Sequence, residues 1–489
     1  MANQDGPVIF DSVHGPVTLS LLSHAIIATE QFQRLKNLKQ VGAGYWVFPA
    51  ASNNRYEHCI GTAHVARKLV RQLAQQTCPE VPKLSSQDLL CIELAGLCHD
   101  LGHGPFSHTF ERFLDEVGCE VRHEETSVLM LKAAVDGSED VRKLLQTEGI
   151  SEQDFTFIQE LIAGPTLTKG KKIRTCTPWP FVGRGREKAF LYEIVANPWN
   201  GIDVDKWDYL GRDCRATGKI NRFSFQTVMG SIKALPLDDG QWRICFDESG
   251  LYELMTMFGQ RGYMHHTVYN CWKKNSIESM LIEAWVAMDK VFYPASESGP
   301  ATRLCEAVKD PDKFLNLTDG ILDTLMKLPC DNPNVRKCQE ILGNIRAGNL
   351  YAFVGSFWLK PGTKINLHKD TDGLKKRVLE LATEGSDGFD ATSAWDWVRV
   401  HYFTGTRTEP DEVYLYSNRD LKAKPASEDI LTAFLEPIYT YDHVQIFART
   451  ECQLSLEVLR KAFETLCEEE GFQVSPQGRT CEWEEIRAP

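Results

Sequence analysis

The segment that most constrains this fold is the apolar run LLCIELAGLC at residues 89–98, which leads directly into HDLGHGPFSH. Apolar residues lie on nearly every side of a helix drawn through 89–103, so we expect a central, buried helix. The same segment carries His99, Asp100 and His103. His99 and His103 are four residues apart and would share one face. Buried charge needs a partner, so the fold must bring other groups or a cation against these side chains.

Composition limits the class of protein. Fifteen cysteines without a C-x-x-C pair indicate free thiols in a reducing compartment, rather than a disulfide framework or a zinc ribbon. The N-terminus lacks a secretion signal and the longest apolar run is too short to span a membrane, which predicts a soluble protein of the cytoplasm or nucleus. A net charge of −13 argues against a dedicated nucleic-acid surface, so local cations must bind any anionic substrate.

Apolar residues at three- and four-residue spacing predict helices in the first third of the chain. These segments are residues 21–40, 62–76, 85–101 and 124–135. Ser85 and Asp88 form a plausible cap, which predicts that the third helix begins near residue 86. Residues 164–188 combine Pro, Gly and basic residues without periodicity, and we expect an exposed loop there.

The C-terminal third has a different pattern, rich in aromatic and β-branched residues between polar turns. The segments 349–359, 397–405, 413–418 and 443–450 are predicted strands of one small sheet, followed by an amphipathic helix at 454–471. The 489 residues are enough for two or three units of ~150 residues. We predict a mainly α protein with a helical core at 1–345 and a smaller α+β lobe at 346–489.

Four side chains are candidates for a metal site. His58 stands at the start of a predicted helix, His99 and Asp100 follow the apolar run, and Asp205 begins a helix in NGIDVDKWDYLGRDC. A single buried histidine is more commonly a hydrogen-bonded core residue, but this group supplies two imidazoles and two carboxylates. That set suits a borderline or harder divalent ion, so zinc, iron and manganese are the candidates.

The order of these residues, with HDLGHGPFSH and GIDVDKWDY, resembles the HD-domain phosphohydrolases. The segments VFPAASNNRYEH at 47–58 and LYEIVANPWNGIDVDKWDYLGRDC at 191–214 further resemble the animal deoxynucleoside triphosphate triphosphohydrolases that combine a sterile alpha motif with an HD domain. The resemblance implies an HD-domain helical core that cleaves a deoxynucleoside triphosphate at the α-phosphate, releasing deoxynucleoside and triphosphate. We expect the catalytic core alone, without the sterile alpha motif domain.

The proposed chemistry needs a proton donor for the leaving 5′-oxygen. His108 is suitable, and Glu111, three residues later, can orient it and raise its basicity. The resemblance places His103 and His123 in the same pocket. A solvated position at a helix start is the alternative for His123.

The resemblance also implies a set of substrate contacts. It assigns Arg55, Lys206, Tyr209 and Arg261 to the triphosphate, with a further magnesium ion, and Gln40, Val41, Asp213, His265 and Tyr269 to the rest of the nucleotide. Gln40 and Asp213 would hold the 3′-hydroxyl. Val41 and Tyr269 would pack on the sugar, and Tyr269 would leave no room for a 2′-hydroxyl.

This chain departs from the family at positions that bind nucleotide activators. Cations or polar residues of the family are replaced by Pro7, Asp247 and Glu253, and an acidic guanine-binding residue is replaced by Ala28. An anion beside Asp247 and Glu253 would be repelled. We therefore expect a monomer or dimer rather than an activator-induced tetramer.

Two other functions stay open. An HD-domain enzyme could hydrolyse another nucleotide phosphoester, although Gln40, Arg261 and Tyr269 argue against it. The chain could also be a nucleotide-binding protein, or bind nucleic acid weakly through basic residues of the 164–188 loop. These are Lys169, Lys171, Lys172, Arg174, Arg184 and Arg186. Such clusters are more commonly solvated loops.

Overall fold

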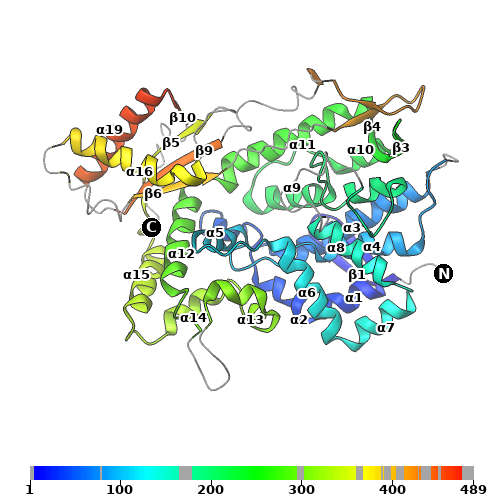
Figure 1. Ribbon diagram of the computed structural model, residues 1–489, viewed down its shortest axis with the longest axis horizontal. Helices are drawn as coiled ribbons and strands as arrows, with labels where there is room; N and C mark the ends of the chain where they lie inside the picture. Colours follow the sequence, from blue (N-terminus) through cyan, green and yellow to red (C-terminus); the bar gives the residue numbers. More distant parts are fainter. Residues whose placement is uncertain are drawn as a thin grey trace. The chain divides into compact units, whose positions relative to one another are not determined.

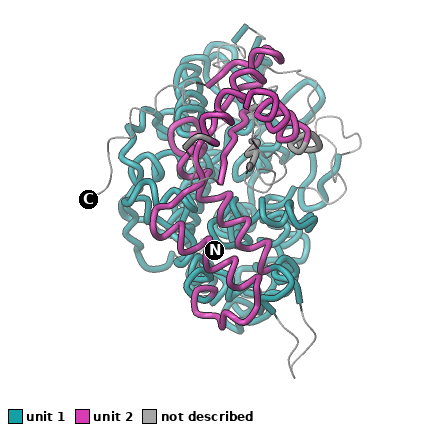
Figure 2. The backbone as a smooth tube through the Cα atoms, turned by 90° about the vertical axis from the view of Figure 1, so that its left-hand side faces the viewer, with its two compact units in different colours: residues 1–264, 289–324, 408–434 teal, residues 265–288, 325–407, 435–489 magenta. Residues whose placement is uncertain are grey.

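The computed structural model describes residues 5–76, 80–164, 179–293, 302–359, 367–386, 389, 398–403, 412–427, 429–430, 442–449 and 453–475. The chain forms two compact units (Figure 2). Unit 1 contains residues 1–264, 289–324 and 408–434, and unit 2 contains 265–288, 325–407 and 435–489. Helices predominate, which confirms the mainly α architecture with small sheets. The boundary at residue 345 stays a prediction.

Unit 1 is built around long helices (Figure 1). Helix α3 (Arg55–Ala74) packs against α4 (Ser86–Cys98) and α9 (Val204–Thr217), and α4 packs on α8 (Glu152–Ala163). Unit 1 also contains β1 (Asp5–Asp11), β2 (Gly15–Ser20), α1 (Leu21–Ile27), α5 (His108–Glu116), α6 (His123–Gly137), α7 (Glu139–Thr147), α10 (Phe225–Gly230), α11 (Leu251–Met264), η8 (Leu304–Lys309) and α13 (Pro311–Leu315). This arrangement brings the N-terminal ends of α3 and α9 close to the C-terminal end of α4.

The apolar run forms α4, as expected, and the helix begins at Ser86. The Ser85 hydroxyl accepts a hydrogen bond from the Asp88 amide while the Asp88 carboxylate accepts one from Ser85, so both amides are satisfied. The helix ends at Cys98, however, and residues 99–107 form turns, so the prediction that His99 and His103 share a helix face is wrong. A side chain on Gly102 would collide with the His123 carbonyl of α6, which shows how closely these turns pack.

The helix predicted over residues 21–40 is also broken. It divides into α1, α2 (Glu30–Gln33) and the 3₁₀ helix η1 (Arg34–Asn37). Thr29 interrupts it with an extended backbone, and its hydroxyl donates a 2.7 Å hydrogen bond to the Ile26 carbonyl. The extended backbone of Thr29 ends the first helix and makes this residue the N-cap of α2, and apolar spacing does not reveal such a break.

The four predicted C-terminal strands are confirmed as β5 (Ala352–Leu359), β6 (Val398–Phe403), β7 (Tyr414–Tyr416) and β9 (Asp442–Ala448). The prediction of one sheet is wrong. Strands β10 (Gln473–Val474), β5, β9 and β6 form one sheet, whereas β7 pairs in parallel with β4 (Trp242–Asp247). That second sheet also contains β3 (Ile232–Pro236) and β8 (Lys424–Pro425).

Unit 2 has its own core. Helices α16 (Leu367–Glu384) and α19 (Gln453–Glu470) pack against the sheet, and the buried cluster includes Phe357, Val444 and Phe463. The unit also contains α12 (Trp272–Met288) packed on α15 (Pro333–Ala347) and the short helix η7 (His265–Tyr269). Helix α14 (Ile321–Lys327) spans the boundary of the two units. Among the described helices, none is long and apolar enough to cross a membrane.

Candidate metal and catalytic site

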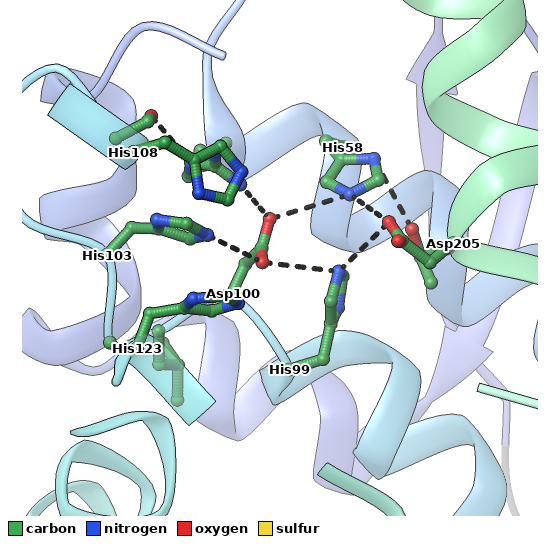
Figure 3. Close-up of polar contacts among 12 residues, drawn as sticks. His58, His99, Asp100, His103, His108, His123 and Asp205 are labelled. Carbon is green, nitrogen blue, oxygen red and sulfur yellow. Dashed lines mark hydrogen bonds and ion pairs between the residues drawn. The ribbon is translucent and has the colours of Figure 1, made fainter. Parts of the chain in front are cut away.

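Three elements of unit 1 bring the predicted metal ligands together (Figure 3). The Asn54–Glu57 capping box starts α3 at Arg55 and places His58 in its first turn. His99 and Asp100 follow α4, and Asp205 lies in the first turn of α9. The His58 imidazole and the Asp100 carboxylate are buried.

The ligand atoms converge. The His58 Nε2 lies 3.0 Å from Asp205 Oδ1 and 3.5 Å from Asp100 Oδ2. The His99 Nε2 lies 3.5 Å from both Asp100 Oδ1 and Asp205 Oδ1. One ligand atom each from His58, His99 and Asp205 falls within a sphere that a single cation could occupy. Asp100 contacts both imidazoles but also pairs with Arg55, so it is shared between the cation site and this guanidinium.

The hydrogen bonds of the two imidazoles suit metal binding. The Nδ1 of His58 contacts Asp208 Oδ2 at 2.7 Å, and the Nδ1 of His99 contacts the Gly96 carbonyl at 2.9 Å. Each contact directs the opposite nitrogen, Nε2, into the cluster, as metal-binding histidines require. The His99 Nε2 is buried without a hydrogen-bond partner. A divalent cation would satisfy it.

The charges around these side chains favour a cation in the site. Burial lowers the pKa of His58, but hydrogen bonds to Asp205 and Asp208 outweigh burial and raise it to about 10. Burial opposes ionisation of Asp205, yet the two imidazoles hold its pKa well below the usual value. Without a cation, protons on the imidazoles balance the carboxylates. A metal ion would replace those protons.

A second cluster lies on the other side of Asp100 (Figure 3). Glu111 Oε2 and Oε1 lie 2.7 Å from the Nδ1 atoms of His108 and His123, respectively. The His103 Nε2 lies 3.2 Å from Asp100 Oδ1. The structure therefore brings the four predicted catalytic side chains together beside the metal ligands.

These four groups could be mistaken for a second metal site, because their ligand atoms are also close. The rings of His103 and His123 are stacked 3.9 Å apart with only 19° between their planes. A metal must lie in the plane of each imidazole that binds it, so two nearly parallel stacked rings cannot share one ion. Burial lowers the pKa of His123, but Glu111 raises it to about 9, whereas burial and Arg55 hold that of His103 well below its usual value. The stack thus pairs a charged ring with a neutral one.

Three of the predicted phosphate contacts, Arg55, Lys206 and Tyr209, lie within four residues of a predicted metal ligand, whereas Arg261 stands on α11. Arg55 donates to Ser107 Oγ at 2.8 Å and pairs with Asp100, so in this structure it is bound to protein groups. Lys206 pairs with Asp203 at 3.0 Å, and Arg261 donates to the Tyr209 hydroxyl. These cations are held in position before any substrate arrives.

The predicted sugar contacts are divided between the two units. Gln40, Val41 and Asp213 lie in unit 1, where the Gln40 Oε1 is buried without a hydrogen-bond partner and Asp213 Oδ1 accepts from Asn53 at 3.1 Å. His265 and Tyr269 lie in unit 2 on η7, with their ring centroids 5.1 Å apart. The substrate roles of all five residues stay predictions.

The groups behind His58 were not predicted from the sequence. Asp208 is fully buried and accepts from His14 Nε2 at 2.6 Å and from Arg212 Nε at 2.8 Å, besides its contact with His58. Gly61 leaves the space for this pair, because a side chain there would collide with Asp208 and Arg212. Asp208 stands three residues after Asp205 and could have been noticed as a further acid of α9. Nothing near His14 in the sequence pointed to this role.

Replacing Asp208 with asparagine is expected to weaken metal binding about 10- to 100-fold, the usual effect of removing a carboxylate that orients a ligating histidine. Competition with a chromogenic chelator measures this affinity directly. Glu93→Gln is the matched control, because Glu93 is also a buried acid, paired with Arg67 at 2.9 Å and with Ser20 and Ser23, away from the ligands. Equal metal affinities of the two variants would contradict the role of Asp208.

The basic loop is only partly described. Lys169, Lys171, Lys172 and Arg174 lie outside the described residues. Arg184 is engaged in ion pairs, with its Nε 2.6 Å from Asp88 and its Nη2 bonded to Asp154. This residue therefore ties its segment to α4 and α8 rather than offering charge to nucleic acid.

Comparison with known proteins agrees with this geometry. A family model described as "HD domain" matches residues 55–153, which include His58, His99 and Asp100. Bovine "Deoxynucleoside triphosphate triphosphohydrolase SAMHD1" is 35% identical over 94% of this chain and 78% of the relative. This chain belongs to the SAMHD1 family.

The SAMHD1 family similarity extends beyond vertebrates. The human SAMHD1 protein is 33% identical over 96% of this chain and 75% of its own length. The SAMHD1 homolog of Dictyostelium discoideum is 30% identical over 97% of this chain and 84% of its own length. The matched region therefore includes both the HD segment and most of the chain that follows it.

Proposed function

We propose that this protein hydrolyses deoxynucleoside triphosphates to deoxynucleosides and inorganic triphosphate. The observation that carries this proposal is the convergence of His58, His99, Asp100 and Asp205 beside the His108–Glu111 pair, in a chain of the SAMHD1 family. The relatives are named for this activity. A transition metal among zinc, iron and manganese, with magnesium on the triphosphate, completes the proposed site.

The metal, when bound, would acidify a water molecule and neutralise phosphate charge. His58 and His99 would hold it through their Nε2 atoms, and Asp205 and Asp100 through carboxylate oxygens. Asp208 keeps His58 in the required tautomer through their 2.7 Å contact. The charge that develops at the α-phosphate would thus meet groups fixed before the reaction.

His108 would donate the proton that the leaving 5′-oxygen requires. Its Nδ1 is held by Glu111 at 2.7 Å, which leaves Nε2 as the donating atom. Glu111 also holds His123, and its own pKa lies well below the usual value because both histidines outweigh its burial. Glu111 therefore stays ionised and can accept a hydrogen bond from each of the two imidazoles.

The remaining predicted residues would bind the nucleotide. Lys206, Tyr209 and Arg261 would contact the triphosphate, and the contact of Arg261 with the Tyr209 hydroxyl keeps two of them adjacent. The buried, unpartnered Gln40 Oε1 is a suitable acceptor for the 3′-hydroxyl.

Product analysis tests this function. The purified protein, loaded with manganese, is incubated with each of the four deoxynucleoside triphosphates and with GTP, and anion-exchange chromatography separates the products. We expect triphosphate and deoxynucleoside in equal amounts, and no turnover of GTP. Release of monophosphate or orthophosphate, or no turnover of any deoxynucleotide, would reject the proposal.

We further propose that the protein is a monomer or dimer that nucleotides do not assemble into a tetramer. Asp247 accepts hydrogen bonds from the Ser249 hydroxyl, from the Ser249 amide and from Asn418, and these bonds lower its pKa, so it is ionised. The Glu253 carboxylate accepts from the Ser224 amide. An activator triphosphate at these positions would approach fixed negative charge.

Light scattering tests the oligomeric state. The molar mass is expected to be the same with and without GTP and deoxyguanosine triphosphate, since Pro7, Asp247 and Glu253 stand where the family has cations or polar residues. Activity should likewise show no lag and no dependence on added GTP. A nucleotide-dependent increase to the mass of a tetramer, fourfold from a monomer or twofold from a dimer, would contradict this prediction.

A further inference from the structure

The two residues before His108 have unusual backbone conformations. Phe106 has φ 55°, and Ser107 has φ 60° with ψ −122°. Non-glycine residues adopt positive φ only where the surrounding structure holds them. His108 begins α5 directly after this turn, so the direction of its imidazole depends on whatever holds Phe106 and Ser107.

Asp319 holds the turn from a distant part of the chain. Its Oδ1 accepts a 2.7 Å hydrogen bond from the Phe106 amide, and its Oδ2 accepts a 2.8 Å hydrogen bond from the Lys39 amide. Burial raises the pKa of Asp319 to about 6, so at pH 7 and above both oxygens are ionised acceptors. One carboxylate therefore connects the segment before His108 with the segment before Gln40.

Ser107 makes the same connection from the other side. Its hydroxyl donates to the Lys39 carbonyl at 2.9 Å and accepts from Arg55 Nε at 2.8 Å. The Lys39 residue is thus held at its amide by Asp319 and at its carbonyl by Ser107. Gly42 allows this approach, because a side chain there would press against the Phe106 carbonyl.

We propose that Asp319 is a positioning residue, which fixes the strained turn before His108 and the Lys39–Gln40 segment in one geometry. The proposal rests on the proposed function, because it assigns His108 to proton donation and Gln40 to the sugar. Asp319 itself would touch no substrate. Its loss would misplace both groups at once, affecting substrate binding as well as the chemical step.

Steady-state kinetics of Asp319→Asn and Asp319→Ala test this idea. The asparagine keeps one acceptor oxygen and should lower kcat about tenfold, whereas alanine keeps none and should lower it about 100-fold. KM should rise in both. A substitution that only reduced the fraction of folded protein would lower the apparent kcat and leave KM unchanged.

Asp289→Asn is the matched control. Asp289 is a buried aspartate that accepts from the Cys305 amide at 3.0 Å and from Arg303 Nε at 2.6 Å, and it contacts none of the catalytic groups in the described structure. We expect this variant to melt at a lower temperature with the wild-type KM. A KM change in Asp289→Asn equal to that in Asp319→Asn would overturn the proposal.

A double-mutant cycle with Ser107→Ala gives a second kinetic readout. If Asp319 and Ser107 hold the same turn, removing either side chain frees the turn, and the remaining side chain can no longer fix it. The factor by which the double variant loses activity should therefore be smaller than the product of the two single factors. Multiplicative losses would show independent roles and overturn the proposal.

Hydrogen exchange tests the positioning without any activity. In Asp319→Ala, the amides of Lys39 and Phe106 should exchange at least about tenfold faster than in the wild-type protein, because each loses its acceptor. In Asp289→Asn they should be unchanged. Unchanged exchange in Asp319→Ala would overturn the proposal. Faster exchange in a protein that hydrolyses no deoxynucleotide would instead support the positioning and reject only the proposed function.

Discussion

Replacing Asp205 with alanine is expected to remove the metal and lower turnover by at least about 10³-fold. Asp205 Oδ1 lies within 3.5 Å of the Nε2 atoms of both His58 and His99, so one oxygen faces both imidazoles, whereas Asp100 contacts them through two different oxygens. A metal ion contributes several kcal/mol to the stabilisation of phosphoryl transition states, and each 1.36 kcal/mol is a factor of ten in rate. Its loss therefore accounts for the expected decrease.

Elemental analysis after dialysis measures metal content, and product formation measures turnover. The wild-type protein should retain about one transition-metal ion per chain and the variant almost none. Asp420→Ala is the control, because this aspartate pairs with Lys424 at 2.9 Å on the surface. An Asp205→Ala protein with full metal content and normal turnover would remove Asp205 from the site.

Metal uptake also has a proton signature. Because His58 has a pKa of about 10 without a cation, its Nε2 is protonated at neutral pH and must lose that proton to bind metal. Adding metal to the metal-free protein should therefore release protons into weakly buffered solution. The Asp205→Ala protein, which should bind no metal, should release none.

The sequence predicted which side chains converge better than it predicted the local structure that brings them together. His58, His99, Asp100 and Asp205 could be named together because each occurs in a short recognisable segment. The turns at 99–107 could not be foreseen, since α4 already ends at Cys98 and Gly102, in the turns after it, packs against the His123 carbonyl of the separate helix α6. Apolar periodicity reports which face is buried, but not where a distant element stops a helix.

Long-range contacts also explain the residues that the sequence did not reveal. Asp319 reaches Phe106 across 213 positions, and His14 reaches Asp208 across 194. Neither residue belongs to a recognisable motif, so only the folded structure shows that they contact the site. Strand β7 is a further example, because its composition correctly predicted a strand but does not indicate which of the two sheets the strand joins.

Replacing His108 with alanine is expected to slow turnover by ~10² to 10⁴ while the metal stays bound, the usual range for loss of a general acid. His108 makes no contact with His58, His99 or Asp205 in the described structure, and Glu111 holds its Nδ1. The loss should therefore fall on kcat, with metal content equal to that of the wild-type protein.

A change of leaving group separates proton donation from other roles of His108. The suitable substrate is a deoxynucleoside triphosphate with sulfur in place of the bridging 5′-oxygen. Its deoxynucleoside leaves as a 5′-thiolate, which needs little protonation because a thiol has a pKa near 8.5. If His108 is the acid, His108→Ala should hydrolyse this analogue nearly as fast as the wild-type protein does. Equal losses on the oxygen and sulfur substrates would mean that His108 orients the substrate instead, and His123, which shares Glu111 with it at 2.7 Å, would become the next residue to test.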